Sequence, residues 1–138
     1  MLNQCSFSPL FKVFSTQKTE NIKVTSVPTT IRFDEGGQNG AANEERLYLL
    51  TAEQGKVILV DFTIFNIEDT AICSGDYVEI GEGHDPNGNM LWKKCGHTLP
   101  AAVTSKSNTF YILFHSGGSA QNSAFSVNVR SSELFHAA

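Results

Sequence analysis

The residues of this sequence most capable of covalent chemistry are its three cysteines, Cys5, Cys73 and Cys95. Their number is odd, and the Cys-x-x-Cys spacing of a typical structural zinc site is missing. A bridge between Cys73 and Cys95 would close a loop of about 22 residues and stabilise the fold by roughly 3 kcal/mol. The spacing is equally compatible with two buried free thiols in a reducing compartment. Cys5 is left over, either free or paired with another chain.

Nucleophilic catalysis is a second chemistry to consider. Ser116 follows His115, and Asp76 or Asp85 would be the acid of a Ser-His-Asp relay. The Gly-x-Ser-x-Gly elbow and the glycine-rich phosphate loop are both missing from the sequence. Almost any chain of this length contains serine, histidine and aspartate, so the combination carries little information. We therefore predict no catalytic residues and a protein that is not an enzyme.

Transition-metal binding is a third possibility, and the histidines are its candidate ligands. They lie in separate segments without the His-x-His or His-x-x-x-His spacing of common metal sites. Positions in surface loops explain them more simply, so the residues themselves indicate no metal cofactor. The four histidines are His84, His97, His115 and His136.

Composition limits the class of protein. The chain has 138 residues, of which 41% are hydrophobic, and 10 basic against 14 acidic side chains. This length predicts one globular domain, and the net charge of −4 argues against nucleic acid as a partner. No apolar run approaches the roughly 20 residues of a membrane span. Residues 1–15 lack the pattern of a secretory signal, so the protein is either not secreted or a mature form with an added Met.

Alternation of apolar and polar residues is the dominant pattern, and it predicts an all-β protein. The clearest segment is 56–65, in which Ile58, Val60, Phe62 and Ile64 are expected to share the buried face. Turn-forming clusters lie between many of the segments, and this arrangement favours an antiparallel two-sheet β-sandwich of seven to nine strands. The predicted strands are 56–65, 109–115 and 123–130, with shorter ones at 7–14, 22–27, 29–33, 46–51, 76–81 and 90–93. Residues 1–40 are expected to be extra strands or an N-terminal extension, 41–132 the sandwich, and 133–138 a C-terminal tail.

From residue 46 to about residue 130, the order of residues resembles the CUB domain family. The resemblance rests on a strand ending in Phe-Asn-Ile-Glu, a cysteine, the sequence Asp-Tyr-Val-Glu-Ile, a Cys-Gly pair and a late Phe-x-Ser. It implies a jelly-roll β-sandwich, a secreted or extracellular setting, a Cys73–Cys95 disulfide and a binding or adhesion module without catalysis. Such modules occur alone, as in spermadhesins, or within larger proteins. The matching residues are Gly55, Phe62, Phe65, Ile67, Glu68, Cys73, Asp76 to Ile80, Cys95, Gly96, Phe114, Ser116 and Phe125.

The sequence also departs from the family pattern. The family usually has a second, N-terminal disulfide, but Arg46 stands near the position of its downstream cysteine. The opening Gly-x-x-x-Ser-Pro segment is replaced by residues 1–40. We therefore expect a divergent member, in which Cys5 or the N-terminal segment could mediate self-association between copies of the chain.

The resemblance also implies a calcium site in many members, formed by three acidic residues at one end of the sandwich. Glu68 and Asp76 match the first two positions, but Gly117 replaces the third acid, and Ser119 fits a neighbouring ligand position. Calcium-assisted capture of a partner's Lys or Arg is therefore one alternative. The other is that Glu68 and Asp76 simply hydrogen-bond the loop backbone.

The same loops are the predicted surface for a protein or glycan partner. Aromatic and small polar side chains suit an interface, and the candidates are Tyr77, His115, Ser116 and Asn122. A glycan would need a shallow basic or aromatic patch. Such a patch requires Lys93, Lys94 and Lys106 to lie beside Trp92, whose alternative is to pack in the core.

Overall fold

The computed structural model describes residues 16–34, 44–117 and 123–134, and these ranges form two β-sheets. Alternating apolar residues, many of them β-branched or aromatic, form the strands because one face of each strand can then be buried. The strands are β1 (Thr16–Lys23), β2 (Thr29–Asp34), β3 (Glu44–Thr51), β4 (Lys56–Asn66), β5 (Tyr77–Glu82), β6 (Met90–Lys94), β7 (Val103–Thr104), β8 (Thr109–His115) and β9 (Ala124–Glu133).

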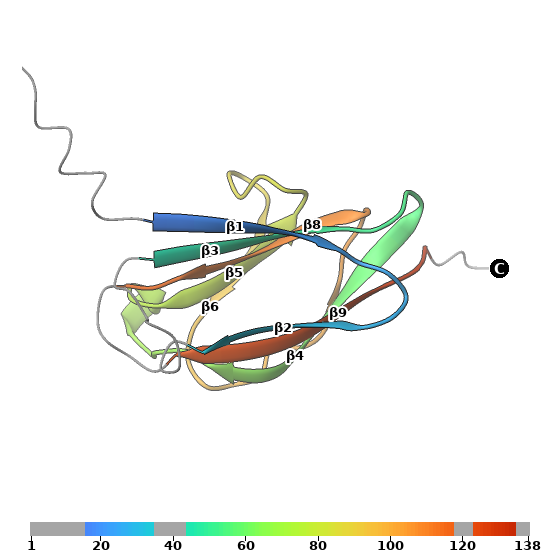
Figure 1. The fold of residues 1–138 in the computed structure, drawn as a ribbon. Coiled ribbons are helices and arrows are strands. Elements are labelled where there is room, and N and C mark those ends of the chain that lie inside the picture. The colour runs from blue at the N-terminus through green and yellow to red at the C-terminus, as the bar shows by residue number, and fades with distance from the viewer. Residues whose placement is uncertain (1–15, 35–43, 118–122, 135–138) are drawn as a thin grey trace, which may run out of the picture.

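The two sheets lie face to face, as Figure 1 shows from the side of the sandwich. The first has the order β1-β3-β8-β5-β6 and the second the order β2-β9-β4-β7. Every described pairing is antiparallel except that of β1 with β3, which run in the same direction. The predicted all-β sandwich is therefore confirmed, with one parallel edge pair that the sequence pattern did not indicate.

The core lies between the sheets and is rich in aromatic rings. Phe33, Phe114 and Phe125 form its centre, with the Phe33 and Phe114 ring centroids 4.6 Å apart. Arg46, near the expected position of the family's N-terminal disulfide, places its guanidinium 4.9 Å from the centre of the Phe33 ring. Its Nε also lies 3.0 Å from a carboxylate oxygen of Glu44. A cation–π contact with Phe33 and an ion pair with Glu44 therefore occupy the place near which the family's disulfide is expected.

The predicted burial of β4 is correct as far as Phe62 and wrong after it. A β-bulge shifts the register with β9 between Phe62 and Ile64. Because the bulge inserts an extra residue, the next apolar side chain inward is that of Phe65, which is 5% exposed, whereas Ile64 is 43% exposed. Strict alternation cannot place a bulge, so Ile64 was assigned to the wrong face.

The predicted strand at 22–27 is correct only at its first two residues and wrong after Lys23. β1 ends at Lys23, and the chain then turns toward the other sheet before β2 begins at Thr29. In this turn the backbone N–H of Val27 donates a hydrogen bond to Thr25 Oγ1 at 3.2 Å. Residues 16–23 and 29–34 thus contribute one strand to each sheet. The predicted strand at 7–14, Cys5 and residues 135–138 lie outside the described residues.

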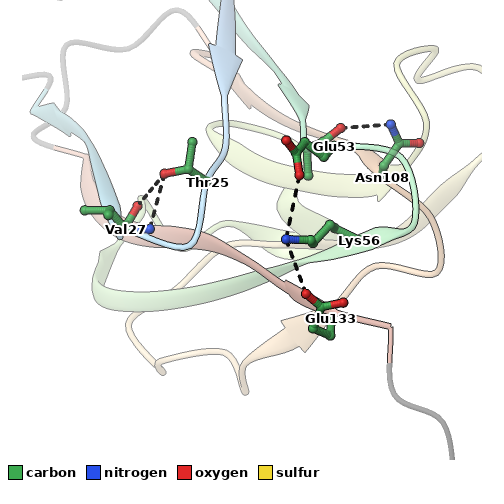
Figure 2. Close-up of polar contacts among 7 residues, drawn as sticks. Thr25, Val27, Glu53, Lys56, Asn108 and Glu133 are labelled. Carbon is green, nitrogen blue, oxygen red and sulfur yellow. Dashed lines mark hydrogen bonds and ion pairs between the residues drawn. The ribbon is translucent and has the colours of Figure 1, made fainter.

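The end of the sandwich that carries this turn is closed by polar contacts (Figure 2). Lys56 Nζ lies 3.7 Å from a Glu53 carboxylate oxygen and 3.4 Å from one of Glu133. The Nδ2 of Asn108 donates to the carbonyl oxygen of Ala52 at 2.9 Å. These ion pairs are largely exposed and contribute little stability, about 0–1 kcal/mol each. The predicted site residues lie at the opposite end.

Candidate binding end of the sandwich

The 67–76 loop connects β4 to β5 and is anchored at several points. At its start, Ile67 and Gly96 exchange two backbone hydrogen bonds of 2.9 Å. A disulfide then joins Cys73 to Cys95, whose Cα atoms are 5.6 Å apart. The disulfide implied by the family resemblance is therefore confirmed, and the alternative of two free thiols is excluded. These links hold the loop against the end of β6.

Asp76 ties this loop to two other segments. Its side chain is fully buried. One carboxylate oxygen accepts a hydrogen bond from the backbone N–H of Gly117, and the other accepts one from Ser123 Oγ, both at 2.7 Å. Ser123 Oγ in turn accepts the backbone N–H of Glu68 at 3.0 Å. A buried carboxylate is tolerated when donors satisfy both of its oxygens, so Asp76 acts as a structural hydrogen-bond acceptor.

The same contacts bear on whether calcium would fit here. Calcium needs six to eight oxygen ligands, with several carboxylates among them. Both oxygens of Asp76 accept hydrogen bonds, and a Cβ atom built on Gly117 would lie 2.7 Å from the backbone of Gly75. The position of the missing third acid therefore has no room for a side chain unless the backbone moves. Among the described residues no cluster of three or more acidic, histidine or cysteine ligands is found, and Ser119 and Asn122 lie outside them. Among the described residues, Glu68 and Asp76 therefore supply only two of the three acids in the family pattern.

Two of the four predicted partner-binding residues, Tyr77 and His115, do come together. They are paired across β5 and β8, and their rings stack with centroids 4.8 Å apart. Lys93 Nζ lies 4.3 Å from the centre of the Tyr77 ring. On the other side of the pair, His115 Nδ1 lies 3.1 Å from Glu45 Oε2, and Glu45 Oε1 accepts a hydrogen bond of 3.1 Å from Gln17 Nε2.

We call these five residues the outer row, because each comes from a different strand on the face of the first sheet turned away from the core. Glu45 and Gln17 are not among the site residues predicted from the sequence, and Lys93 is predicted there for another patch. These residues come together because their strands are neighbours in the sheet, and the residue pattern within a single strand does not reveal which strands will be neighbours. Burial raises the pKa of the Tyr77 phenol, with smaller contributions from Glu45 and Glu79, so the ring stays neutral at physiological pH.

The Ser-His-Asp relay, which the sequence did not favour, is not formed among the described residues. Ser116 is 1% exposed, and its backbone N–H donates to the carbonyl oxygen of Glu44 at 2.8 Å. His115 faces Glu45 and Tyr77, while both oxygens of Asp76 are bonded elsewhere. Burial also removes the Ser116 side chain from the surface offered to a partner.

The remaining histidines occupy separate places. His84 Nε2 contacts the carbonyl oxygen of Leu50 at 3.0 Å, and His97 Nδ1 contacts the side chain of Asn66. His136 lies outside the described residues. Both His84 and His97 are exposed, and their rings contact oxygen atoms on different segments.

The lysine and tryptophan patch considered for a glycan is divided between two faces of the first sheet. Trp92 pairs with Ile80 and packs inward, its ring 5.9 Å from that of Phe62. Lys94 follows Trp92 on this side, 5.3 Å from its ring, whereas Lys93 belongs to the outer row. Alternation along β6 explains the division.

Comparison with known proteins places this architecture in a family. The family model for the CUB domain matches residues 18–129. The chain belongs to the CUB domain family. Rat cubilin is 36% identical over 88 residues, which is 63% of this chain and 2% of cubilin. The human inactive serine protease PAMR1 is 33% identical over 72 residues, 52% of this chain and 10% of that protein.

The MASP-1 CUB2 domain bound to Ca2+ has the same fold. It superimposes with a TM-score of 0.61 at 25% identity, covering 78% of this chain and 96% of that domain. CUB domains are typically extracellular protein-binding modules and are generally non-catalytic. In the described part of this CUB domain, no helix has the length and hydropathy needed to cross a membrane.

Proposed function

We propose that this CUB domain is a non-enzymatic extracellular binding module that contacts a protein partner with the outer row and the neighbouring 67–76 loop. The observation that carries this proposal is the position of the partly exposed Tyr77 ring. It is held between the His115 ring and the Lys93 ammonium. An aromatic ring fixed at the surface loses little side-chain entropy on binding.

The composition of the surface supports the same proposal. Aromatic residues are enriched in protein interfaces, and charged groups at their edges set orientation and partner choice. The outer row has the aromatic pair at its centre, with Lys93 and Gln17 exposed at its two ends. A glycan partner has less support, because Trp92 is turned toward Phe62 and away from this face.

We also propose that recognition does not depend on bound calcium. What supports this is the hydrogen bonding of Asp76, which ties the loop to Gly117 and Ser123 without an ion. Calcium-assisted capture of a basic side chain would need ligands beyond the carboxylates of Glu68 and Asp76. Thermal unfolding in calcium and in chelator distinguishes calcium-independent recognition from calcium-assisted capture.

Position-specific photo-cross-linking tests the binding surface. Benzoylphenylalanine replaces Lys93 in one protein and Asp61, exposed on β4, in the control, and each is irradiated on intact cells. The proposal predicts a protein adduct at position 93 that excess unlabelled wild-type chain abolishes and excess Tyr77→Ala chain does not. Circular dichroism must show that Tyr77→Ala is folded, and His115→Ala replaces it otherwise. Equal adducts at both positions, or equal competition by both chains, would contradict the proposal.

A further inference from the structure

The 67–76 loop carries an isoleucine that packs against almost nothing. Ile72 is 89% exposed, the highest value among the large apolar side chains of the described ranges. Its backbone φ is +51°, and Cys73 has the same value. The left-handed region is unfavourable for residues with a Cβ atom and most of all for β-branched ones. The chain therefore holds an apolar side chain in water, on an unfavourable backbone, without packing in return.

This conformation is kept in place by its surroundings. The disulfide fixes Cys73 directly after the tip, and the backbone N–H of Cys73 donates to the carbonyl oxygen of Thr70 at 3.1 Å. The backbone N–H of Gly75 donates to Thr70 Oγ1 at 3.0 Å. Backbone strain of this kind persists only where the structure enforces it, and it is concentrated at functional sites. A rigid tip also presents its side chain at little cost in conformational entropy.

We infer that Ile72 is the apolar anchor of the binding surface and inserts into an apolar pocket, rimmed by basic side chains, on a protein partner. The inference rests on the proposed function, since it requires this end of the sandwich to face the partner. The negative charge of the loop is the reason to expect basic side chains around that pocket. Residues 67–76 contain three acids and no lysine or arginine. Asp76 is buried, whereas Glu68 and Asp69 reach the surface and form no ion pair within the described ranges.

The same charge argues against a lipid surface as the occupant. Loops that insert into membranes gain affinity from basic residues near anionic headgroups, and acidic residues oppose it. One isoleucine also buries too little apolar area to hold a domain at a bilayer by itself. A protein pocket with a basic rim would bury the apolar side chain of Ile72 and complement the negative charge of the loop.

Selection of binders from a synthetic single-domain antibody library, displayed on yeast against the wild-type chain, tests the inference. Ile72→Asn removes the apolar side chain and suits the backbone, because asparagine tolerates the left-handed region. Val27→Asn is the matched control, since Val27 is 68% exposed at the opposite end. We expect most clones to lose about tenfold or more in affinity for Ile72→Asn and to bind Val27→Asn normally. The melting temperature of Ile72→Asn should not fall.

A second pair of variants checks the rim. Glu68→Gln and Asp69→Asn together should weaken the same clones, whose binding loops should be rich in lysine and arginine. Clones that lose affinity for Tyr77→Ala but not for Ile72→Asn would refute the anchor and leave the binding surface standing. Clones that bind Tyr77→Ala and Ile72→Asn as well as they bind the wild type would refute both the anchor and the binding surface. Wild-type chain that co-floats with phosphatidylcholine vesicles, with or without phosphatidylserine, and loses this in Ile72→Asn would assign a membrane and overturn the inference.

Discussion

Replacing Asp76 by alanine should destabilise the domain strongly and equally with and without calcium. The variant loses two hydrogen bonds to a buried carboxylate, those from Gly117 and Ser123. Hydrogen bonds to charged groups contribute about 1.5–3 kcal/mol each. We take the lower value because Gly117 is exposed, so water can satisfy its N–H once the carboxylate is removed. The expected loss is therefore about 3 kcal/mol, or roughly 12 °C in Tm for a domain of this size.

Differential scanning calorimetry in millimolar calcium, and again in excess chelator, measures this loss for wild type and variant. Asp61→Ala is the control, because Asp61 is exposed on β4 and its removal should change stability by less than about 0.5 kcal/mol. If Asp76 were instead a calcium ligand, saturating calcium would stabilise the wild type by about 2.7 kcal/mol at 100 times the dissociation constant. A wild-type Tm that rises by several degrees in calcium, with the rise absent in Asp76→Ala, would refute the hydrogen-bonding role.

Four further outcomes are expected. Phe62→Ala should cost about 3–5 kcal/mol in urea unfolding, whereas Ile64→Ala should be nearly neutral, and equal losses would contradict the bulge in β4. Cys95→Ser should lower stability by roughly 3 kcal/mol, and an unchanged Tm would show that the disulfide is absent in solution. Gly117→Asp should destabilise by about 1–3 kcal/mol, because its Cβ meets the neighbouring loop backbone, and a neutral result would show that the loop yields. Burial raises the pKa of the Tyr111 phenol above the ordinary value near 10. The contribution of the neutral phenol to the free energy of unfolding is therefore complete below pH 10 and is lost as the pH rises further. Tyr111→Phe should flatten this alkaline fall in stability by up to about 1.4 kcal/mol per pH unit, as measured by urea unfolding at several pH values.

Local pattern was sufficient for much of the fold. The alternation in 56–65 and 109–115 identified the strands β4 and β8, and the residues from Gly55 to Phe125 carried the family resemblance. The Cys73–Cys95 pairing followed from that resemblance, since spacing alone left two possibilities. These features depend on residues close in sequence or on an ordered motif, so they can be read without coordinates.

The outer row, in contrast, depended on the order and register of the strands in the sheet. Glu45, His115 and Tyr77 become neighbours only because β3, β8 and β5 are adjacent in the sheet and in one register. Strand order is decided by which pairings bury the most apolar surface together, and this is a property of the whole chain.

The sequence by itself therefore determined the class, the family and the residue types at the binding end. Tertiary structure decided how those residues are used. It placed Ser116 inside, committed the carboxylate of Asp76 to Gly117 and Ser123, and left Ile72 in water on a left-handed backbone. The physical reason is that hydrogen-bond partners and exposure are set by segments distant in sequence, which meet only when the two sheets close over their common core.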